Sequence, residues 1–374
     1  MQQQADFIVI GAGIAGASAA YFLSASGSVI LLERESQPGY HSTGRSAAIF
    51  TETYGNETIR ALTRSSRPFL ADPPSGFSEN SLLLSRGLLY IGNQEQRANL
   101  EQTYRSAHKQ VSSIRQLSAA EALDLIPVLN EDTLAAAVYE PDAMDIDVAS
   151  LHQGYLKGLA NKGGSLQTGA AVTGMARMKS GWQVTTPLGN YTAEVVINAA
   201  GAWCDLIAEM ATAAKIGLAP LRRTVILFDP PGDLDSSGWP FCVDIDEGFY
   251  FRPYTGKILA SPADESPSPP CDAQPEELDI ATTAALVERS TALRIGSISH
   301  KWAGLRTFAP DSTPVVGFDR DLPGFFWLAG QGGYGIKTSP ALGRTAAELV
   351  VKGELPQDLR AAGVRTQQLA PDRF

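Results

Sequence analysis

The sequence has few of the residues that bind metals or form disulfides. It contains three cysteines and four histidines among 374 residues. The cysteines, Cys204, Cys242 and Cys271, are odd in number and far apart, so they form neither a disulfide framework nor a cluster with metal-ligand spacing. The histidines include no closely spaced pair that would grip zinc. We therefore expect no metal site and a reducing compartment.

Excess positive charge and long apolar runs are also missing. Lys and Arg number 30 against 40 Asp and Glu, and the net charge of −10 disfavours binding to nucleic acid or anionic membrane surfaces. No stretch approaches the roughly 20 apolar residues that cross a bilayer. The first apolar run, Phe7 to Ile10, lacks a basic flank and ends in a glycine-rich turn, unlike a secretion signal. We expect a cytoplasmic protein with a small-molecule substrate and no membrane span.

The apolar runs that are present predict an α/β protein. With 44% hydrophobic residues, the chain can bury a large core. Residues 6–32 show the pattern of a strand, a helix and a second strand. Runs typical of buried strands return at Glu194–Asn198 and Phe325–Ala329, so one parallel sheet could collect them all.

Other runs alternate or are rich in aromatic residues, which favours antiparallel strands. They lie at Leu82–Ile91, Thr224–Phe228 and Gly248–Phe251. The expected architecture is a Rossmann-like dinucleotide-binding domain with a parallel sheet, plus an inserted α+β domain with a mixed or antiparallel sheet. The first domain is expected at residues 1–80, 146–215 and 300–374, and the second at 81–145 and 216–299.

The turn after the first strand carries a dinucleotide fingerprint. Gly11 permits the tight turn, Gly13 lets a pyrophosphate approach the backbone, and Gly16 allows close helix packing. Glu33 ends the second strand, where a carboxylate binds an adenosine ribose and repels the 2′-phosphate of NADP. The alternative is a glycine-rich turn without a ligand, and the motif alone does not separate NAD from FAD. The residues expected at the dinucleotide are Gly11, Gly13, Ile14, Ala15, Gly16, Glu33 and Arg34.

Four further segments carry a family resemblance. Residues 40–48 read Tyr-His-Ser-Thr-Gly-Arg-Ser-Ala-Ala, and residues 196–203 read Val-Ile-Asn-Ala-Ala-Gly-Ala-Trp. Residues 328–340 form a second glycine-rich turn, and residues 302–317 closely resemble a family signature. Over nearly its whole length the chain resembles the D-amino-acid oxidase/dehydrogenase family of flavoproteins, which includes glycine oxidase and sarcosine oxidase. Its closest likeness is to the bacterial D-arginine dehydrogenase branch.

The resemblance implies FAD as the cofactor of the first domain. We expect it to be non-covalent, because no cysteine or histidine lies in a turn that we place beside the flavin ring except His41, which we interpret as a structural loop residue. The second glycine-rich turn is expected to start a helix, with hydroxyl caps before Pro340, whose positive end stabilises negative charge on the flavin N1/C2=O edge. Lys337 adds a cation there or is an exposed lysine without a role. The residues implied at FAD are Ser42, Thr43, Arg45, Ser46, Ala47, Ala48, Val172, Ala199, Gly201, Trp203, Gly332, Gly333, Tyr334, Gly335, Ile336, Lys337 and Thr338.

The same resemblance implies a site that fixes a carboxylate. Arg306 aligns with the family's carboxylate-binding arginine, whose planar fork pairs with two oxygens; its alternative role is a surface salt bridge. Arg223 aligns with a second arginine, although it or Arg222 could be a structural ion pair. Tyr250 and Tyr54 align with substrate-facing tyrosines, against the alternative of core tyrosines.

Backbone near these residues is also expected to take part. The carbonyl of Gly333 is implied as the acceptor for the substrate amine. The Gly55-Asn56 pair after Tyr54 suggests a mobile lid. No side chain has the pattern of an obligatory general base. We therefore expect hydride transfer from Cα to flavin N5, with an amine that binds neutral or loses its proton through water, giving an imine that hydrolyses to a 2-oxo acid and ammonia.

Two positions depart from the D-arginine branch. Ile49 stands where that branch has a histidine, and Leu88 where it has an acid that meets a guanidinium. An apolar wall does not compensate the desolvation of a distal cation, so neutral or hydrophobic D-amino acids are the expected substrates. Oxidation of glycine, sarcosine or another secondary amine is the first alternative, and an FAD-binding electron-transfer subunit is the second. Oxygen and a quinone-like electron acceptor both stay open.

Overall fold

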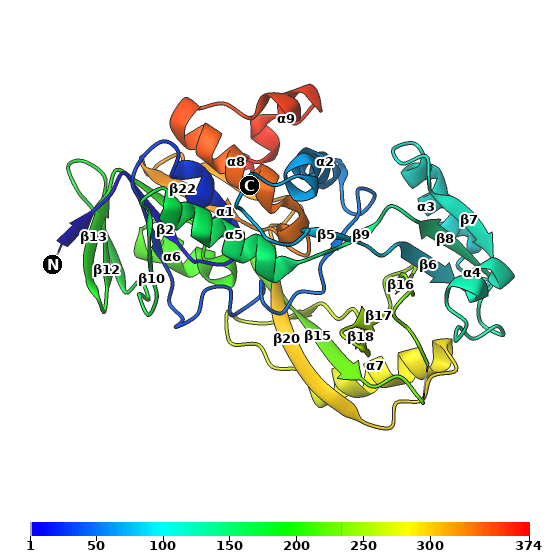
Figure 1. The fold of residues 1–374 in the computed structure, drawn as a ribbon. Coiled ribbons are helices and arrows are strands. Elements are labelled where there is room, and N and C mark those ends of the chain that lie inside the picture. The colour runs from blue at the N-terminus through cyan, green and yellow to red at the C-terminus, as the bar shows by residue number, and fades with distance from the viewer. Residues whose placement is uncertain (1, 233) are drawn as a thin grey trace.

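The computed structural model describes residues 2–232 and 234–374 and contains the parallel sheet that the sequence predicts (Figure 1). Its six strands lie in the order β10-β3-β2-β14-β22-β21, all parallel except β21, which pairs antiparallel with β22. All four strands expected from apolar runs are confirmed, because short apolar runs between glycine-rich turns are typical of strands buried on both faces. The strands are β2 (Phe7–Ile10), β3 (Val29–Leu32), β10 (Ser165–Gln167), β14 (Val195–Asn198), β21 (Val315–Phe318) and β22 (Phe325–Ala329).

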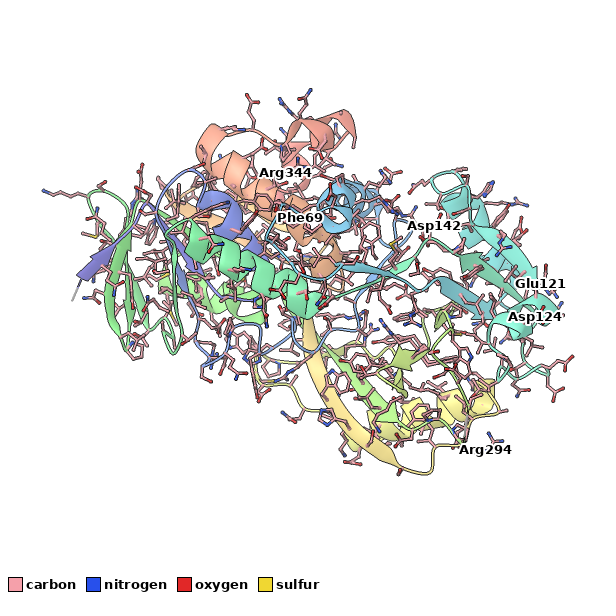
Figure 2. All side chains as sticks on the ribbon, in the orientation of Figure 1. Phe69, Glu121, Asp124, Asp142, Arg294 and Arg344 are labelled. Atoms are coloured by element: carbon pink, nitrogen blue, oxygen red, sulfur yellow. The ribbon has the colours of Figure 1, made fainter. Side chains whose placement is uncertain are left out.

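Helices cover one face of this sheet and a small sheet covers the other. Small residues let α1 and α8 approach closely, since a Cβ on Gly343 would lie 2.8 Å from Ser18. Aromatic rings pack between α2 and α5, where Phe69, labelled in Figure 2, stacks on Tyr155 with ring centroids 5.8 Å apart. The helices are α1 (Ile14–Leu23), α2 (Glu57–Ala71), α5 (Val148–Asn161), α8 (Gly335–Lys352) and α9 (Gln357–Ala361). The small sheet contains β1 (Gln2–Gln4), β11 (Gly174–Arg177), β12 (Trp182–Thr186) and β13 (Gly189–Ala193).

A second large sheet has nine strands and mixed directions, which confirms the expected fold class. Eight strands lie in the order β19-β15-β18-β17-β16-β6-β8-β7, and the long β20 pairs with β15. The neighbours are antiparallel except β6 and β16, which are parallel. The strands are β6 (Leu88–Gly92), β7 (Arg115–Ser118), β8 (Ala136–Glu140), β15 (Ala219–Phe228), β16 (Phe241–Asp244), β17 (Tyr250–Tyr254), β18 (Lys257–Ser261), β19 (Ser266–Pro267) and β20 (Ile298–Phe308).

Three helices and a short sheet accompany the nine-stranded sheet. The helices are α3 (Arg97–His108), α4 (Ala119–Leu125) and α7 (Glu277–Ser290), and a further short helix, α6 (Cys204–Met210), follows β14. In Figure 1 the strand β20 runs from this region back toward the first sheet.

Three acidic residues near the nine-stranded sheet are exposed to solvent. They are Glu121, Asp124 and Asp142, labelled in Figure 2. No helix in the described part of the chain is long and apolar enough to cross a membrane.

Two local expectations were wrong. The run Leu82–Ile91 is not one strand: β5 (Leu83–Ser85) joins β4 (Ile49–Phe50) and β9 (Met144–Ile146) in a three-stranded sheet, and Gly87, with a positive φ of 78°, turns the chain into β6. Helix α8 begins at Gly335, before the hydroxyl residues, so Thr338 and Ser339 are not caps and Pro340 lies inside the helix. Ser339 Oγ donates to the Ile336 carbonyl at 3.0 Å, which satisfies an acceptor that Pro340 has no N–H to reach.

Candidate active site

A cavity of about 570 Å³ joins the fingerprint turn to the face of the nine-stranded sheet. Seven residues expected at the substrate line it: Ile49, Tyr54, Leu88, Arg223, Tyr250, Arg306 and Gly333. Most residues expected at the cofactor line it as well, and only Gly16, Tyr334 and Thr338 do not. The structure therefore brings together, from widely separated parts of the chain, nearly every residue singled out in the sequence.

The fingerprint turn requires glycine for reasons that the structure makes explicit. Gly11 has a positive φ of 97°, and a Cβ there would lie 2.6 Å from the Ala199 carbonyl oxygen. A Cβ on Gly16 would lie 1.8 Å from the Gly11 carbonyl oxygen, so the start of α1 packs directly on the turn. Gly16 thus contributes to the site through packing, without lining the cavity. The bare backbone leaves room for a pyrophosphate, which fits a bound dinucleotide.

Glu33 supports the fingerprint turn from the cavity wall. Its Oε2 accepts from the Ala12 N–H at 2.8 Å and its Oε1 accepts from the Glu35 N–H at 2.9 Å. A carboxylate has about four acceptor positions, so capacity for a ribose hydroxyl is left. The first amide of α1 is already bonded within the protein, because the Ile14 N–H donates to Thr43 Oγ1 at 2.9 Å. Thr43 thereby fastens the 40–48 loop to the turn.

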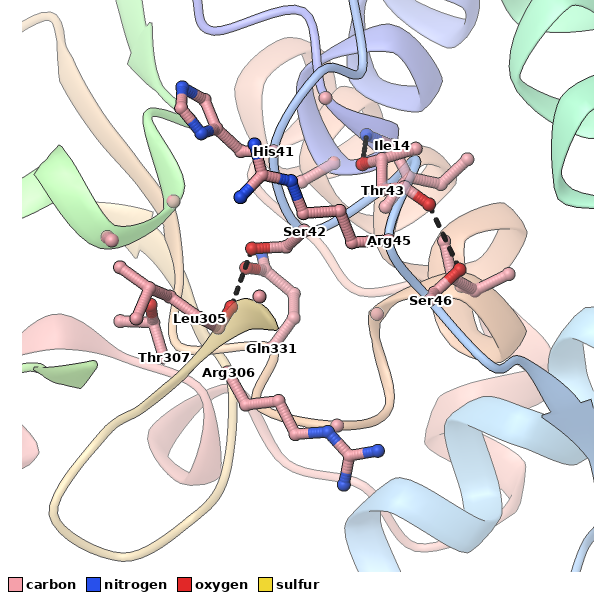
Figure 3. Close-up of a pocket in the computed structure, with 18 of the residues that line it drawn as sticks. Ile14, His41, Ser42, Thr43, Arg45, Ser46, Leu305, Arg306, Thr307 and Gln331 are labelled. Carbon is pink, nitrogen blue, oxygen red and sulfur yellow. Dashed lines mark hydrogen bonds between the residues drawn. The ribbon is translucent and has the colours of Figure 1, made fainter. Parts of the chain in front are cut away.

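The 40–48 loop crosses the cavity and is fixed to β20 (Figure 3). Ser42 Oγ donates to the Leu305 carbonyl, and Ser46 Oγ donates to the Thr43 carbonyl at 3.0 Å. Arg45 forms an ion pair with Asp272 and donates at 3.0 Å to two backbone carbonyls. Because its guanidinium is bound to the protein, Arg45 holds the loop closed over the cavity.

The far end of the cavity has the aromatic and apolar character that an adenosine needs. Trp203 lies 4.9 Å below the Arg34 guanidinium and 4.7 Å from the His41 ring. His41 Nε2 is 2.9 Å from Glu35, so the histidine belongs to this end of the cavity. Val172 lines the cavity as well. Sequence reasoning missed Leu206, Ile207 and Met210 of α6, which also line it and whose only signal is their apolar character in the helix that follows β14.

The opposite end contains polar groups that have no partner among the residues that the structure describes. Arg306, on β20, is half-buried, and within the described residues its guanidinium forms no ion pair and no hydrogen bond; in Figure 3 it extends away from Ser42 and Thr43. Tyr250 is 5% exposed, yet its buried hydroxyl finds no partner among the described residues. Such groups are costly unless a ligand satisfies them.

Adjacent arginines on β15 have different surroundings, because successive residues of a strand point to opposite faces. Arg222 bonds to Asp279 at 3.0 Å and to Glu276, which makes it the structural ion pair. Arg223 lines the cavity, where its guanidinium lies 6.0 Å from the Tyr250 ring and its Nη2 donates to Glu265 at 3.0 Å. Two cations and one unsatisfied hydroxyl therefore lie at this end.

The wall beside these groups is apolar. One face of the nine-stranded sheet lines the cavity, because alternate residues of three strands point into it. These residues are Leu88 and Tyr90 on β6, Arg223 and Val225 on β15, and Phe241 and Val243 on β16. Ile49 packs against the same cluster. The sequence had already indicated Ile49, Leu88 and Arg223. It gave no signal for Tyr90, Val225, Phe241 and Val243, which come from strands that pair only in the folded sheet.

Tyr54 closes this end of the cavity by contacting the turn between β16 and β17, which lies across the cavity from it. Its Oη donates to Glu247 Oε2 at 3.1 Å, and its ring centroid lies 5.2 Å from that of Tyr334. Burial, followed by the nearby Glu247 carboxylate, raises the pKa of Tyr54. In the Gly55-Asn56 pair that follows, Asn56 caps α2 by accepting from the Ile59 N–H at 3.0 Å, and the mobile lid stays a prediction. Glu247 had no signal in the sequence, since it lies 193 residues away.

The start of α8 supplies the last part of the cavity wall. Gly335, Ile336 and Lys337 line it, and no described side chain caps the helix, so its first N–H groups add positive potential there. Lys337 is 3% exposed, which excludes the exposed lysine we considered, and burial lowers its pKa to about 7. Gln331, which the sequence analysis did not single out, also lines the cavity, and its buried Nε2 has no hydrogen-bond partner in the described part of the chain. No cluster able to hold a metal occurs within residues 2–232 and 234–374.

Comparison with known proteins identifies the family. Residues 6–349 match the family model described as DAO, FAD dependent oxidoreductase. Dimethylglycine dehydrogenase of Rattus norvegicus is 24% identical over 96% of the chain, and the chain spans only 44% of that protein's length. Glycine oxidase of Geobacillus kaustophilus is 23% identical, with 96% of both chains covered.

Solved structures share the fold. L-Proline dehydrogenase from P. horikoshii has a TM-score of 0.86 at 22% identity, covering 100% of this chain and 98% of its own. An L-alpha-glycerophosphate oxidase from Mycoplasma pneumoniae, solved with FAD bound, has a TM-score of 0.84 at 18% identity, covering 93% of this chain and 95% of its own. The glycine-only turn, the carboxylate of Glu33 and the aromatic adenosine end of the cavity fit that cofactor. The chain belongs to the DAO family of FAD-dependent oxidoreductases, and its cofactor is FAD.

Proposed function

We propose that the protein oxidises the amine of small amino acids, preferring neutral or hydrophobic D-amino acids. The observation that carries the proposal is the pair of unsatisfied groups in one cavity: the Arg306 guanidinium without an ion pair and the buried Tyr250 hydroxyl without a partner, both within the described residues. A carboxylate would satisfy both, because a guanidinium pairs with two oxygens and the hydroxyl donates to one of them. The relatives named above supply the reaction class.

The chain's own residues would orient the substrate as follows. Arg306 and Tyr250 hold the carboxylate, and Arg223 adds positive potential beside them. The Gly333 carbonyl accepts from the amine, which would be close to the carboxylate because a Cβ on Gly333 would lie 3.0 Å from Arg306 Nη1. Tyr54 closes the cavity and excludes water. When bound, FAD supplies the acceptor for the Cα hydride, and the resulting imine hydrolyses to a 2-oxo acid and ammonia.

The substrate side chain would face the apolar sheet surface. Ile49, Leu88 and Phe241 offer no partner for a distal cation, so the cost of desolvating D-arginine would not be recovered there. Glu247 is the one acidic lining residue at this end among the described residues, and its carboxylate already accepts from Tyr54. We therefore propose a substrate preference different from that of the D-arginine branch.

Oxidation of glycine or an N-methylated glycine is the second candidate. The similarity to dimethylglycine dehydrogenase and glycine oxidase favours it, and the same carboxylate pair would serve those substrates. An electron-transfer subunit without its own substrate is not favoured, because it needs no unsatisfied arginine beside a buried hydroxyl. We also propose that FAD is non-covalent, since the histidine we considered for attachment is bonded to Glu35 beside Trp203 at the adenosine end.

A substrate panel tests the proposal. The FAD-loaded protein is mixed without oxygen with D- and L-amino acids, glycine, sarcosine and dimethylglycine, and the flavin absorbance near about 450 nm is followed. We expect the fastest bleaching with D-leucine or D-methionine, slower bleaching with D-arginine and none with the L-enantiomers. Fastest bleaching with sarcosine or dimethylglycine would select the second candidate. Admitting air and then a quinone to the reduced protein identifies the electron acceptor.

A further inference from the structure

The segment of residues 51–54 carries Tyr54 into the cavity without belonging to any sheet or helix. It links β4 to α2, and its residues form no strand ladder and no helical turn. Its Thr51 and Tyr54 nevertheless line the cavity. Side chains from distant parts of the chain must therefore fix this segment in place.

Lys337 binds the segment from the side of α8. Its Nζ donates to the Thr51 carbonyl at 2.9 Å and to the Tyr54 carbonyl at 3.0 Å. A lysine donates three hydrogens when charged and two when neutral, so both forms can keep these two bonds. The two bonds hold both ends of the segment.

Glu140, at the end of β8, binds the same segment from the other side. It is 3% exposed, and its Oε2 accepts from Thr51 Oγ1 at 2.8 Å and from Thr53 Oγ1 at 2.7 Å. The two threonine hydroxyls also lie 2.9 Å apart. An ionised Glu140 accepts from both hydroxyls, and the contact between the two threonines then has no proton. A protonated Glu140 would donate to one threonine and accept from the other, so that all three contacts are hydrogen bonds.

The charges around this group are few and mostly buried. Lys337 faces Glu140, Arg60 and Glu52, together with the rings of Tyr54 and Tyr334, while Tyr90 lies near Glu140. Burial lowers the pKa of Lys337 to about 7 and raises the pKa of Glu140. Both forms of the pair can therefore maintain the bonds to the segment near neutral pH.

We propose that Lys337 and Glu140 are positioning residues that together clamp residues 51–54, so that Tyr54 holds one closed position over the cavity and slows the escape of a bound carboxylate. The contact of Tyr54 with Glu247 then closes the cavity between a fixed segment and the turn that joins β16 to β17. The part of this proposal that concerns retention of a carboxylate rests on the proposed function. The part that concerns the hydrogen bonds of Lys337 and Glu140 to residues 51–54 is independent of the proposed function.

Hydrogen exchange on the FAD-loaded protein tests the clamp. Thr53→Val removes the hydroxyl that contacts Glu140 and Thr51 and keeps the shape of the side chain, whereas Lys337→Met removes both carbonyl bonds. Loss of a buried hydrogen bond makes local opening about five- to tenfold easier, so we expect amides of residues 51–55 to exchange about five- to tenfold faster in Thr53→Val and at least about tenfold faster in Lys337→Met. Lys352→Met, at the exposed end of the same helix, is the control and should exchange as the wild type does. Unchanged exchange at residues 51–55 in Thr53→Val and Lys337→Met overturns the clamp.

Release of benzoate, a carboxylate probe, tests the consequence for the site. Benzoate bound to the wild type and to Thr53→Val is displaced in a stopped-flow instrument while the flavin absorbance is followed. We expect several-fold faster release from Thr53→Val with unchanged FAD content. If amide exchange at residues 51–55 is faster but benzoate release is unchanged, Lys337 and Glu140 only stabilise the fold. That result overturns their proposed role in holding Tyr54 over the cavity. If the wild type does not bind benzoate, the carboxylate site of the proposed function fails, while the exchange result still decides on the clamp.

Discussion

Replacement of Arg306 should weaken substrate binding more than any other single change at the site. The guanidinium is half-buried and has no ion pair within the described residues, so its positive charge is available to a carboxylate. Truncating one member of a desolvated charge pair costs about 2–5 kcal/mol. Because about 1.4 kcal/mol is a factor of ten, Arg306→Gln should raise the Kd between about 30-fold and a few thousandfold.

Arg306→Lys separates charge from geometry. Lysine keeps the cation but offers a single point of contact, and the second of two charge-assisted hydrogen bonds contributes about 1.5–3 kcal/mol. We therefore expect Arg306→Lys to bind substrate more tightly than Arg306→Gln and at least about tenfold more weakly than the wild type.

The assay is an anaerobic stopped-flow titration with the best substrate of the panel. The dependence of the flavin bleaching rate on substrate concentration separates the Kd from the limiting rate. Arg320→Gln, an exposed arginine on the surface, is the control and should behave as the wild type. Equal Kd values for Arg306→Gln and the wild type, at equal FAD content, would refute the assignment of Arg306 to the carboxylate.

Three further predictions concern the neighbouring residues. Tyr250→Phe removes a hydroxyl that has no described partner in the protein, so the fold should be as stable as before by urea titration, while the Kd for substrate rises about tenfold. Leu88→Glu places an acid on the apolar wall, and the ratio of bleaching rates for D-arginine over D-leucine should rise; an unchanged ratio would show that Leu88 does not face the side chain. Burial lowers the pKa of Lys337 from its ordinary 10.5 to about 7. The buried charge therefore lowers the free energy of unfolding most below about pH 7, and this destabilisation disappears as the pH rises toward 10.5. The urea midpoint of the wild type should therefore rise between pH 7 and 9.5, and Lys337→Met should lose most of that rise.

The sequence was sufficient to predict the parallel sheet because its signals are local. Each of the four apolar runs of the first sheet adjoins a turn of small residues. Within the fingerprint, Gly16 is required by its contact with Gly11, whereas Gly11 is required by the Ala199 carbonyl of a distant turn. The family resemblance then supplied Arg306, Tyr250 and Tyr54, which all line one cavity. Their roles at the substrate stay predictions.

What the sequence could not predict depends on long-range contacts. Glu247 meets Tyr54 across 193 residues, and Glu140 meets Thr51 across 89, so neither acid had a signal of its own. The burial of Lys337 depends on the segment that folds over α8. One remaining error is local: α8 begins at Gly335, before its hydroxyl residues, so Thr338 and Ser339 do not cap it.

The most direct test of the proposed reaction is anaerobic reduction of the flavin by D-leucine and by D-leucine deuterated at Cα. If the protein removes a hydride from Cα of neutral D-amino acids, both compounds bleach the flavin, the deuterated one more slowly, and one 2-oxo acid forms for each flavin reduced. A flavin that dithionite reduces but neither D-leucine nor the other D-amino acids of the panel bleach would contradict the account.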